Sequence, residues 1–379
     1  MHITGIGRTK FGSLPRTLPE LAYEAMYDAI ADGNIDITEI DAIFVSNFLG
    51  GPLNGQLHLN SVIASLLPGM NVPVVRVETA CASSSTALKQ ALFALEKLDH
   101  VMVVGVEKMT SPDVLGTTEA IAMAADRRID QINGLIFPAN YALIAQQYMQ
   151  KYGVDHEVLE QVALINHQNA RLNPLAHFYY KEVTLDVIRR SPVISTPLNL
   201  FDCSPISDGA AAVVVSKESR SARDAKVLSC QFMADSTSLT QRSNLTSFNA
   251  ARLAAKKAYA ESGTAPRDID IVEVHDCFTI SELIALEDLG FCPPGEAARM
   301  VGEGRILRDG DIPVNTDGGL KADGHPIGAT GLAQVYEIVT QLRGEAGKRQ
   351  VPGARKGMTH NVGGIGGTAA VTILEGSKC

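Results

Sequence analysis

An internal repeat is the feature of this sequence that most constrains its fold. Residues 21–47, LAYEAMYDAIADGNIDITEIDAIFVSN, have the order amphipathic helix, polar turn, apolar strand, and residues 253–276, LAAKKAYAESGTAPRDIDIVEVHD, repeat that order. The Ile-Asp pair at 40–41 in the first segment matches the Ile-Asp pair at 269–270 in the second. A repeat of this kind predicts two structurally related halves.

A second pair of segments supports the same division. DGAAAVVVS at 208–216 and GGTAAVTIL at 366–374 each place a glycine turn before a strand of small and β-branched residues. Because each half alternates strands with helices, we expect an α/β fold with mostly parallel sheets covered by helices. We place the first half at residues 1–225 and the second at residues 226–379.

The segment from residue 111 to about residue 200 interrupts the repeat. It is rich in Met, Asn, Gln and Tyr and contains proline loops such as NPLAHFYY and SPVISTPLNLF. We interpret it as a loop domain inserted in the first half. A lid over a ligand, a dimer contact and a surface elaboration all fit this pattern.

Composition excludes several classes of function for this chain. With 379 residues, 45% of them hydrophobic, it is long enough for two well-buried cores, and its net charge of -9 argues against nucleic acid or an anionic membrane as the main partner. We find no signal peptide and no apolar run of about 18 residues, so we expect a cytoplasmic protein. The last residues, GSKC, match a peroxisomal Ser-Lys-Leu ending in two of three positions, which we interpret as chance.

The cysteines suggest neither a disulfide framework nor a metal site. The six cysteines at 81, 203, 230, 277, 292 and 379 include no Cys-x-x-Cys pair and no matching Cys/His spacing. We therefore expect no metal and a reducing compartment.

Cys81 lies where an apolar strand meets a helix. VPVVRV at 72–77 is β-branched, and ALKQALFALEKL from residue 87 has helical spacing. At a helix N-terminus the helix dipole and free N–H groups favour a thiolate, which would make Cys81 a nucleophile. The alternative is a small buried apolar residue.

Three further stretches place candidate catalytic groups at the ends of predicted strands, where the binding and active sites of α/β folds usually lie. VEVHDCFTISE at 272–282 brings His275 and Cys277 to one side of an extended segment, unless it is only a helix capped near Asp276. GGLKADGHPIGATG from residue 318 carries His325 and lacks the spacing of a phosphate-binding loop. HNVGGIGGTAAVTIL from residue 360 offers backbone N–H groups to an oxyanion, or forms a tight packed turn.

Together these stretches supply a thiol at a helix end, two loop histidines, a second thiol and free backbone amides. Acyl transfer through a covalent thioester needs such a nucleophile, base, acid and oxyanion donors.

The order of CAS, SPISDGAAAVVV, HDCF, GHPIGATG and the final glycine-rich loop resembles the thiolase superfamily across essentially the whole chain. HDCF narrows the resemblance to sterol-carrier-protein-type thiolases and archaeal and bacterial acetyl-CoA acetyltransferases. The resemblance implies a five-layered αβαβα sandwich of two similar halves, a homodimer or tetramer, and acyl-CoA substrates. It also implies that coenzyme A is a substrate and that no cofactor is permanently bound.

The resemblance also implies roles for individual residues. Cys81 would be the acylated nucleophile, and His325 would take its proton and later donate to the thioester oxygen. His275 would complete that oxyanion hole. The backbone N–H groups of Cys81 and Gly363 would form a second oxyanion hole around the acyl-enzyme carbonyl.

The chain departs from many thiolases in two places. Asn361 stands where they carry an acid/base cysteine, so the resemblance assigns proton transfer at the substrate α-carbon to Cys277, with a pKa poised near neutral by its neighbours. Ser83–Ser85 replace a segment that often contains glycine, and they would narrow the pocket or cap the helix. In GLIFPANYAL, Phe137 and Asn140 are candidates for the acyl-binding wall, and a buried amphipathic helix would explain them equally well.

We weigh four functions for this chain. The leading one is a thiolase that cleaves 3-ketoacyl-CoA or condenses acyl-CoA through a Cys81 acyl-enzyme. The second is acyl transfer to a non-CoA acceptor such as a phenol, and the third is retro-aldol cleavage, against which the presence of Cys81 argues. The fourth is a non-catalytic subunit. Archaeal relatives assemble with a small zinc-ribbon/OB-fold protein that completes the CoA site, so dependence on such a partner stays open.

Overall fold

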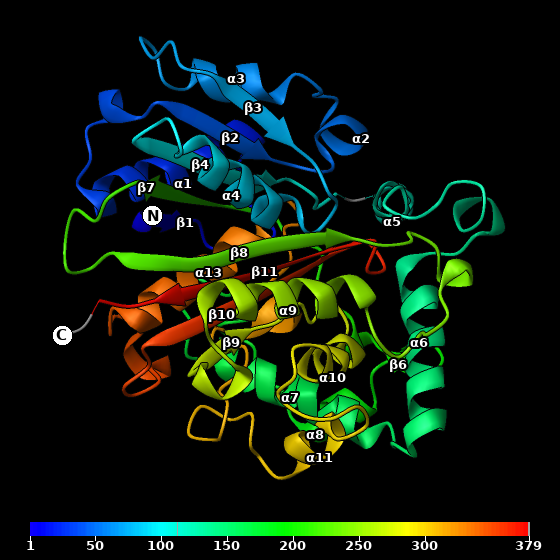
Figure 1. Cartoon of the computed structure of the whole chain (residues 1–379). Coiled ribbons are helices and arrows are strands. Elements are labelled where there is room, and N and C mark those ends of the chain that lie inside the picture. Colours follow the sequence, from blue (N-terminus) through cyan, green and yellow to red (C-terminus); the bar gives the residue numbers. More distant parts are fainter. Residues whose placement is uncertain (112, 378–379) are drawn as a thin grey trace.

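The sequence repeat corresponds to a structural repeat in the computed structural model, which describes residues 1–111 and 113–377 (Figure 1). In the first half, helix α1 (Leu18–Gly33) leads to strand β2 (Ala42–Ser46). In the second half, α9 (Asn249–Ser262) leads to β9 (Ile271–Glu273) in the same way. Cys379, and with it the end of the GSKC sequence, lies outside the described residues.

The two matching Ile-Asp pairs have the same structural role. Ile40 and Ile269 are buried, and each following aspartate holds the start of a neighbouring strand. Asp41 accepts the two backbone N–H groups that open β4 (His100–Glu107), at 2.9 and 3.0 Å. Asp270 accepts the two that open β10 (Lys356–Gly363), both at 2.8 Å. The predicted relationship between the halves therefore extends to individual hydrogen bonds.

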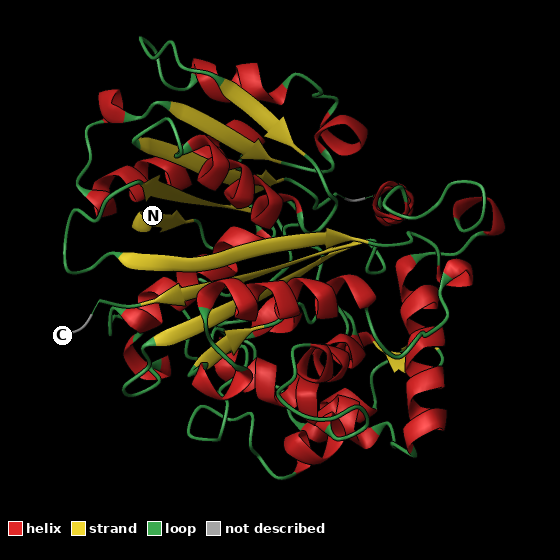
Figure 2. Ribbon diagram, in the orientation of Figure 1, coloured by secondary structure: helices red, strands yellow, loops and turns green. Residues whose placement is uncertain are grey.

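Nine strands form one continuous sheet made of two half-sheets. The first half-sheet has the order β3-β2-β4-β7-β1, and the second has the order β8-β11-β10-β9 (Figure 2). They join edge to edge where β1 pairs with β8 over two residue pairs, His2 with Lys226 and Ile3 with Ala225. The remaining strands of these half-sheets are β1 (His2–Arg8), β3 (Val74–Val77), β7 (Gly209–Ser216), β8 (Ala225–Ala234) and β11 (Thr368–Glu375).

The half-sheets are mixed, so the expectation of mostly parallel sheets is wrong. β7 runs antiparallel to both β1 and β4, and β11 runs antiparallel to both β8 and β10. The parallel pairs within the described part of the chain are β2 with β3, β2 with β4 and β9 with β10. β10 and β11 are joined by a short glycine turn, and such a hairpin connection allows only antiparallel pairing. β7 is buried on both faces, and its composition therefore resembles that of a buried parallel strand.

Helices and half-sheets alternate in five layers, as predicted. α1 covers the outer face of the first half-sheet, and α9 covers the outer face of the second. α4 (Ser83–Ala94) and α13 (Thr330–Leu342) lie between the half-sheets and contact strands of both. α13 is buried along almost its whole length, which is typical of a helix enclosed on both sides. The other helices of the two halves are α2 (Gly50–Asn54), α3 (Leu59–Ser65), α10 (Thr279–Asp288), α11 (Ala297–Gly302) and α12 (Gly319–Ala322).

The inserted segment is largely helical and packs against the second half. It contains α5 (Val114–Ala122), α6 (Phe137–Tyr152), α7 (Glu157–Ala170), α8 (Leu185–Arg189) and a hairpin of β5 (Val193–Ser195) and β6 (Leu198–Asn199). α6 contacts α10, while α7 contacts α10, α11 and α12. The division into halves at residue 225 stays a prediction, and that residue is the first of β8. None of the described helices is long and apolar enough to cross a membrane.

Candidate active site

Cys81 lies in a tight turn between β3 and α4, two residues before the first helical residue, as its position in the sequence predicts. The preceding residue, Ala80, has φ +51°. A left-handed conformation costs a residue with a side chain roughly 1–2 kcal/mol, so the surrounding structure must hold this turn. The Ser83 hydroxyl does so by accepting the Thr79 N–H (2.9 Å) and donating to the Ala80 carbonyl (2.5 Å).

Burial keeps Cys81 protonated. The residue is 7% exposed, and desolvation together with the neighbouring Cys277 raises the pKa of the Cys81 thiol above its ordinary value. The N–H groups of Gly364 and of Cys81 itself act in the opposite direction but do not offset the burial. The expectation that the helix end yields a ready thiolate is therefore wrong, and a base must remove the proton before the Cys81 sulfur can act as a nucleophile.

Two histidines converge on the Cys81 sulfur. One atom from each of Cys81, His275 and His325 lies within 4.8 Å of the other two, and the two imidazole rings are 5.2 Å apart at an interplanar angle of 86°. In the described part of the chain this is the one group of three or more histidine, cysteine or carboxylate side chains close enough to share a metal ion. We expect no metal there, and that expectation stays a prediction.

The hydrogen bonds of His325 leave its Nε2 able to accept a proton. Its Nδ1 lies 2.7 Å from the hydroxyl oxygen of Thr330, whose own O–H donates to the Pro326 carbonyl (3.1 Å). With that O–H directed at Pro326, the Thr330 oxygen is left to accept from His325 Nδ1–H, and His325 Nε2 then carries no proton. Burial lowers the pKa of His325 to about 3, so the ring is neutral and its Nε2 lone pair can accept the Cys81 proton.

Glu107, at the end of β4, holds the His325 loop against the first half. This buried carboxylate accepts the backbone N–H groups of Phe48, Leu49 and Gly328 at 2.9–3.0 Å. A Cβ at Gly328 would lie 2.8 Å from the Cα of Asn47, so only glycine allows this approach. Glu107 is not among the residues predicted from the sequence. The sequence feature that could have indicated it is a single carboxylate at the end of an apolar strand, VMVVGVE.

His275 and Cys277 follow β9 and are both buried, but Cys277 lines the cavity beside Cys81 and His275 does not, so the prediction of one shared pocket is not confirmed. Asp276 between them does not cap α10, which Phe278 precedes. Its carboxylate instead accepts the N–H groups of Leu320 (2.7 Å) and Lys321 (3.1 Å) in the His325 loop. The alternative interpretation of this stretch as a capped helix is therefore wrong.

Cys277 is also a neutral thiol. Burial raises its pKa to about 12, although the polar neighbours Tyr141 and Ser281 lower it. The expectation of a pKa near neutral is therefore wrong, because desolvation outweighs the polar neighbours. Tyr141, which our sequence analysis missed, stacks on Phe278 at 4.4 Å and donates to the Gly364 carbonyl at 3.1 Å.

An apolar cavity of about 310 Å³ lies beside Cys81. Cys81, Cys277, His325 and Gly364 line it, and Phe137 with several apolar side chains of the inserted segment forms its outer wall. Asn140 does not line it, because its amide nitrogen turns back to the Ile136 carbonyl (3.3 Å). None of Ser83–Ser85 lines it either. Gly363 is the last residue of β10, and the next residue, Gly364, places its N–H at the Cys81 sulfur.

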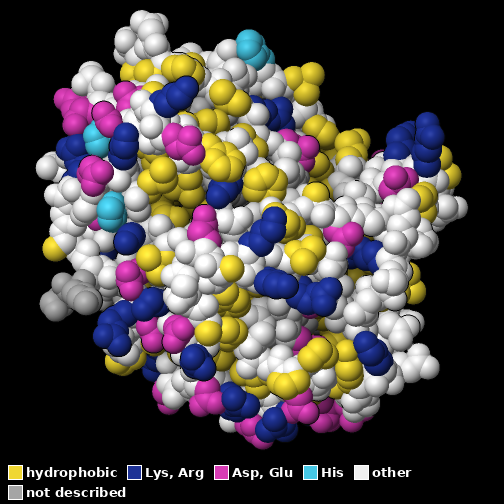
Figure 3. All heavy atoms as spheres, viewed as in Figure 1, with side chains coloured by type: hydrophobic (Ala, Val, Ile, Leu, Met, Phe, Trp, Pro, Cys, Tyr) yellow, Lys and Arg dark blue, Asp and Glu magenta, His cyan; other side chains and the backbone are white. Residues whose placement is uncertain are grey.

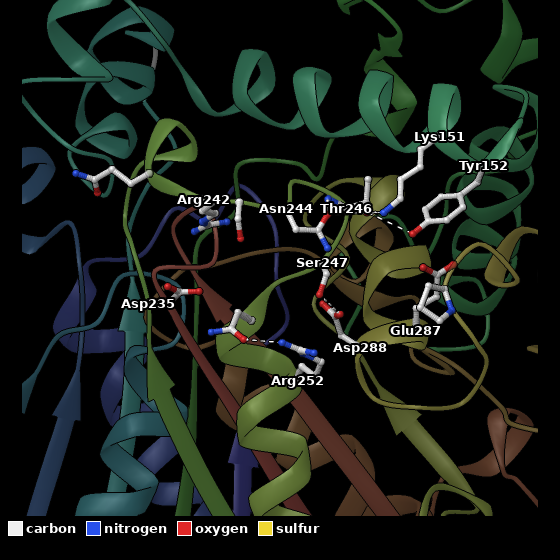
Figure 4. A pocket seen from close by; sticks show the side chains of 14 residues that line it. Lys151, Tyr152, Asp235, Arg242, Asn244, Thr246, Ser247, Arg252, Glu287 and Asp288 are labelled. Carbon is white, nitrogen blue, oxygen red and sulfur yellow. Dashed lines mark hydrogen bonds between the residues drawn. The ribbon is translucent and has the colours of Figure 1, made fainter.

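A larger, polar pocket of about 460 Å³ lies elsewhere, between α6, the start of α9 and the end of α10 (Figure 4). Its charged groups are largely bonded within the protein: Lys151 donates to Thr246 (2.9 Å), and Asp288 accepts from the Ser247 hydroxyl (2.5 Å). None of the predicted catalytic residues lines this pocket.

The low pKa of His325 predicts a flat pH profile for acylation. His325 accepts a proton only when it is neutral, and with a pKa of about 3 it is neutral throughout the physiological range. The rate of acyl-enzyme formation should therefore not fall between about pH 8 and about pH 5, whereas a base with an ordinary histidine pKa of about 6.5 would lose activity there. Rapid-quench mass spectrometry measures this rate, and an acid limb near the ordinary histidine pKa would contradict the prediction.

The chain matches the family description "Thiolase, N-terminal domain" over residues 1–219 and "Thiolase C-terminal domain-like" over residues 232–376. It belongs to the thiolase family. The predicted five-layered fold and the assignment as a thiolase enzyme are therefore confirmed.

Its relatives point to the branch suggested by HDCF. The chain is 46% identical to the acetyl-CoA acetyltransferase of Methanothermobacter thermautotrophicus, with 98% of each chain covered. It is 34% identical to human sterol carrier protein 2, with 99% of this chain and 72% of that protein covered. The solved structure described as Ltp2-ChsH2(DUF35) aldolase is similar with a TM-score of 0.85 at 26% identity, covering 100% of this chain and 98% of that one.

Proposed function

We propose that this protein is a thiolase that transfers acetyl or longer acyl groups between Cys81 and coenzyme A, which is a substrate and not a bound cofactor. The observation that carries this proposal is the meeting of a thiol from the first half with two histidines from the second, beside an apolar cavity that also contains Cys277. The 46% identity to an acetyl-CoA acetyltransferase supports acetyl-CoA as a substrate.

In the cleavage direction the first step forms the acyl-enzyme. His325 Nε2 takes the Cys81 proton while the sulfur attacks the 3-keto carbon of a 3-ketoacyl-CoA. The bond between C2 and C3 then breaks, its electron pair goes to the departing acetyl-CoA, and the Cys277 thiol protonates C2. A thiol with a raised pKa is suited to this step because it holds its proton until the carbanion forms.

The second step returns the enzyme to its starting state. Coenzyme A gives its thiol proton to the Cys277 thiolate and attacks the acyl-enzyme carbonyl, and Cys81 leaves and regains its proton from His325. Backbone N–H groups at Cys81 and at the Gly363–Gly364 turn would stabilise the oxyanion, and His275 would stabilise the thioester oxygen. Condensation uses the same groups in reverse.

Acetylation of the intact protein tests this function. After incubation with acetyl-CoA, wild type and Cys277→Ala should both gain the mass of one acetyl group, whereas only wild type should form acetoacetyl-CoA. If wild type acquires no acetyl group, the proposal fails for the free-standing chain. If it becomes acetylated but coenzyme A does not discharge it, a non-CoA acceptor such as a phenol replaces coenzyme A in the second step.

We also propose that a second component raises activity. The likeness to a structure described as Ltp2-ChsH2(DUF35) aldolase supports this, as do the exposed apolar side chains of Val114 and Leu115 on α5, beside the cavity. A zinc-ribbon/OB-fold partner would complete the CoA site there. A purified DUF35 protein should then increase turnover, and unchanged turnover would contradict this part of the proposal.

The absence of disulfides among the described cysteines supports a cytoplasmic location.

A homodimer formed through the β3 edge is a further part of the proposal. β3 is the edge strand of the first half-sheet, Val75 on it is 47% exposed, and Phe93 on α4 is 51% exposed. Figure 3 shows that hydrophobic side chains gather on this part of the surface, over β3 and α4. An unpaired edge next to exposed apolar surface is a typical site of pairing between chains.

Val75→Lys is therefore expected to convert the dimer to a monomer, because a charged residue on an edge strand opposes pairing. Light scattering measures the molar mass. Val193→Lys, an equally drastic change at a residue that is 64% exposed on β5, should leave the mass unchanged. A monomeric wild type, or a dimer that survives Val75→Lys, would contradict this interface.

A further inference from the structure

Asn361 stands where many thiolases carry a catalytic cysteine, yet it does not line the substrate cavity. It lies on β10, is fully buried, and has two polar neighbours. Its Oδ1 accepts the Ser85 hydroxyl at 3.1 Å, and its Nδ2 lies 2.9 Å from Nδ1 of His275. The Asn361 side chain therefore links helix α4 to the histidine that faces Cys81.

This arrangement determines which nitrogen of His275 carries the proton. An amide NH₂ group can only donate, so His275 Nδ1 must accept and cannot itself be protonated. A neutral imidazole has one proton, which must then be on Nε2. His275 Nε2 is buried and has no hydrogen-bond partner among the described residues. Its N–H is thus free to bond a substrate atom, and a buried donor strongly favours such a partner.

The two histidines beside Cys81 therefore have opposite tautomers. Thr330 accepts from Nδ1–H of His325 and leaves a lone pair on its Nε2, whereas Asn361 donates to Nδ1 of His275 and leaves a proton on its Nε2. One ring can accept the thiol proton, and the other can donate to an oxyanion. Each role depends on the residue bonded to Nδ1.

We propose that Asn361 is a positioning residue that fixes His275 as the Nε2–H tautomer and so makes it a hydrogen-bond donor to the thioester oxygen, with Ser85 holding the Asn361 amide in the required orientation. This inference rests on the proposed thiolase function for its catalytic consequence. The tautomer itself does not depend on that function and can be measured without substrate.

Asn361→Asp is the discriminating variant. A carboxylate of nearly the same size can only accept, so it draws the His275 proton to Nδ1 and turns Nε2 into an acceptor that opposes an oxyanion. Turnover at about pH 8 should fall about 10²–10³-fold, the loss typical of one missing oxyanion donor.

The loss should depend on pH. The new carboxylate favours the charged imidazolium and raises the pKa of His275, against the effects of burial and of His325 and His360, which lower it. Below that raised pKa both ring nitrogens carry protons, so Nε2–H returns and activity should recover as the pH falls. Wild type, whose tautomer is set by an uncharged amide, should show no such recovery.

Two neighbouring serines provide a matched comparison. Ser85→Ala removes the hydroxyl that holds Asn361 Oδ1, so the amide can turn over, and turnover should fall about tenfold. Ser84 is equally buried on the same helix and accepts the Leu332 N–H (3.2 Å), and it makes no hydrogen bond to Asn361 among the described residues. Ser84→Ala should change turnover less than about twofold.

NMR of ¹⁵N-histidine-labelled wild type, with His275→Gln used to assign the signal, distinguishes a protonated from an unprotonated ring nitrogen. We expect a proton on Nε2 and none on Nδ1. A proton on Nδ1 would overturn the inference, and so would an Asn361→Asp variant whose pH profile runs parallel to that of wild type. If the Asn361→Asp variant does not fold, the wild-type spectrum alone shows which ring nitrogen of His275 carries the proton. If the tautomer is as expected but acetyl-CoA never acylates wild type, the proposed function fails and the assignment of His275 stands.

Discussion

Cys81→Ser is expected to form no acyl-enzyme and to lower turnover by at least about 10³-fold, the order of loss seen when a covalent nucleophile is removed. Serine keeps the shape of the turn but replaces the thiol by a hydroxyl, a much weaker nucleophile at neutral pH. Because Ala80 is held in a left-handed conformation, the side chain of residue 81 stays aimed at the cavity in both proteins. Intact-protein mass after exposure to acetyl-CoA measures the adduct directly.

Cys203→Ser is the matched control for this experiment. Cys203 lines the same cavity, but it lies outside the group formed by Cys81 and the two histidines. The control variant should form the adduct as wild type does. An acetyl group retained by Cys81→Ser, and lost in Cys277→Ala, would show that the nucleophile is Cys277 and that the roles of the two thiols are exchanged.

His325→Asn is expected to slow acylation about 10²–10⁴-fold, the usual contribution of a general base. The effect should be at the upper end because burial raises the pKa of the Cys81 thiol, so little thiolate exists without a base. An asparagine amide can occupy the place of Nδ1 near Thr330, so the variant removes chiefly Nε2. Stopped-flow or rapid-quench acylation with acetyl-CoA gives the rate constant.

Thr330→Val tests the contribution of the residue that orients the His325 ring. It removes the acceptor of His325 Nδ1–H but keeps the ring, so acylation should fall only about tenfold as the wrong tautomer becomes populated. If His325→Asn acylates as fast as wild type, His325 is not the base, and His275 is the remaining imidazole beside Cys81.

The overall architecture could be predicted because the repeat is visible in the sequence. The matching Ile-Asp pairs place equivalent helices and strands in both halves, and in the structure Asp41 and Asp270 make equivalent hydrogen bonds. Strand direction could not be predicted in the same way. β7 and β11 are buried on both faces, and their composition does not show whether their neighbours run parallel or antiparallel.

The positions of the candidate site residues could be predicted, but their protonation could not. Cys81, His275, Cys277 and His325 each lie in a loop next to a helix or strand end, which is where the sequence places them. Their pKa values depend on burial, to which distant parts of the chain contribute. Glu107 and Thr330 were missed for a related reason, since each acts through a contact that only the fold creates.

The continuous sheet has a consequence for how substrate can enter. Cys81 belongs to one half and His325 to the other, so any hinge motion between the halves would pull these two side chains apart. The β1–β8 pairing and the shared helices α4 and α13 oppose such a motion, because opening it would break strand hydrogen bonds and expose buried side chains. We therefore expect the distance between Cys81 and His325 to stay constant. Movements that admit or release a ligand are then expected in α5 and the β5–β6 hairpin, which contribute side chains to the cavity lining, and hydrogen exchange should be fastest there.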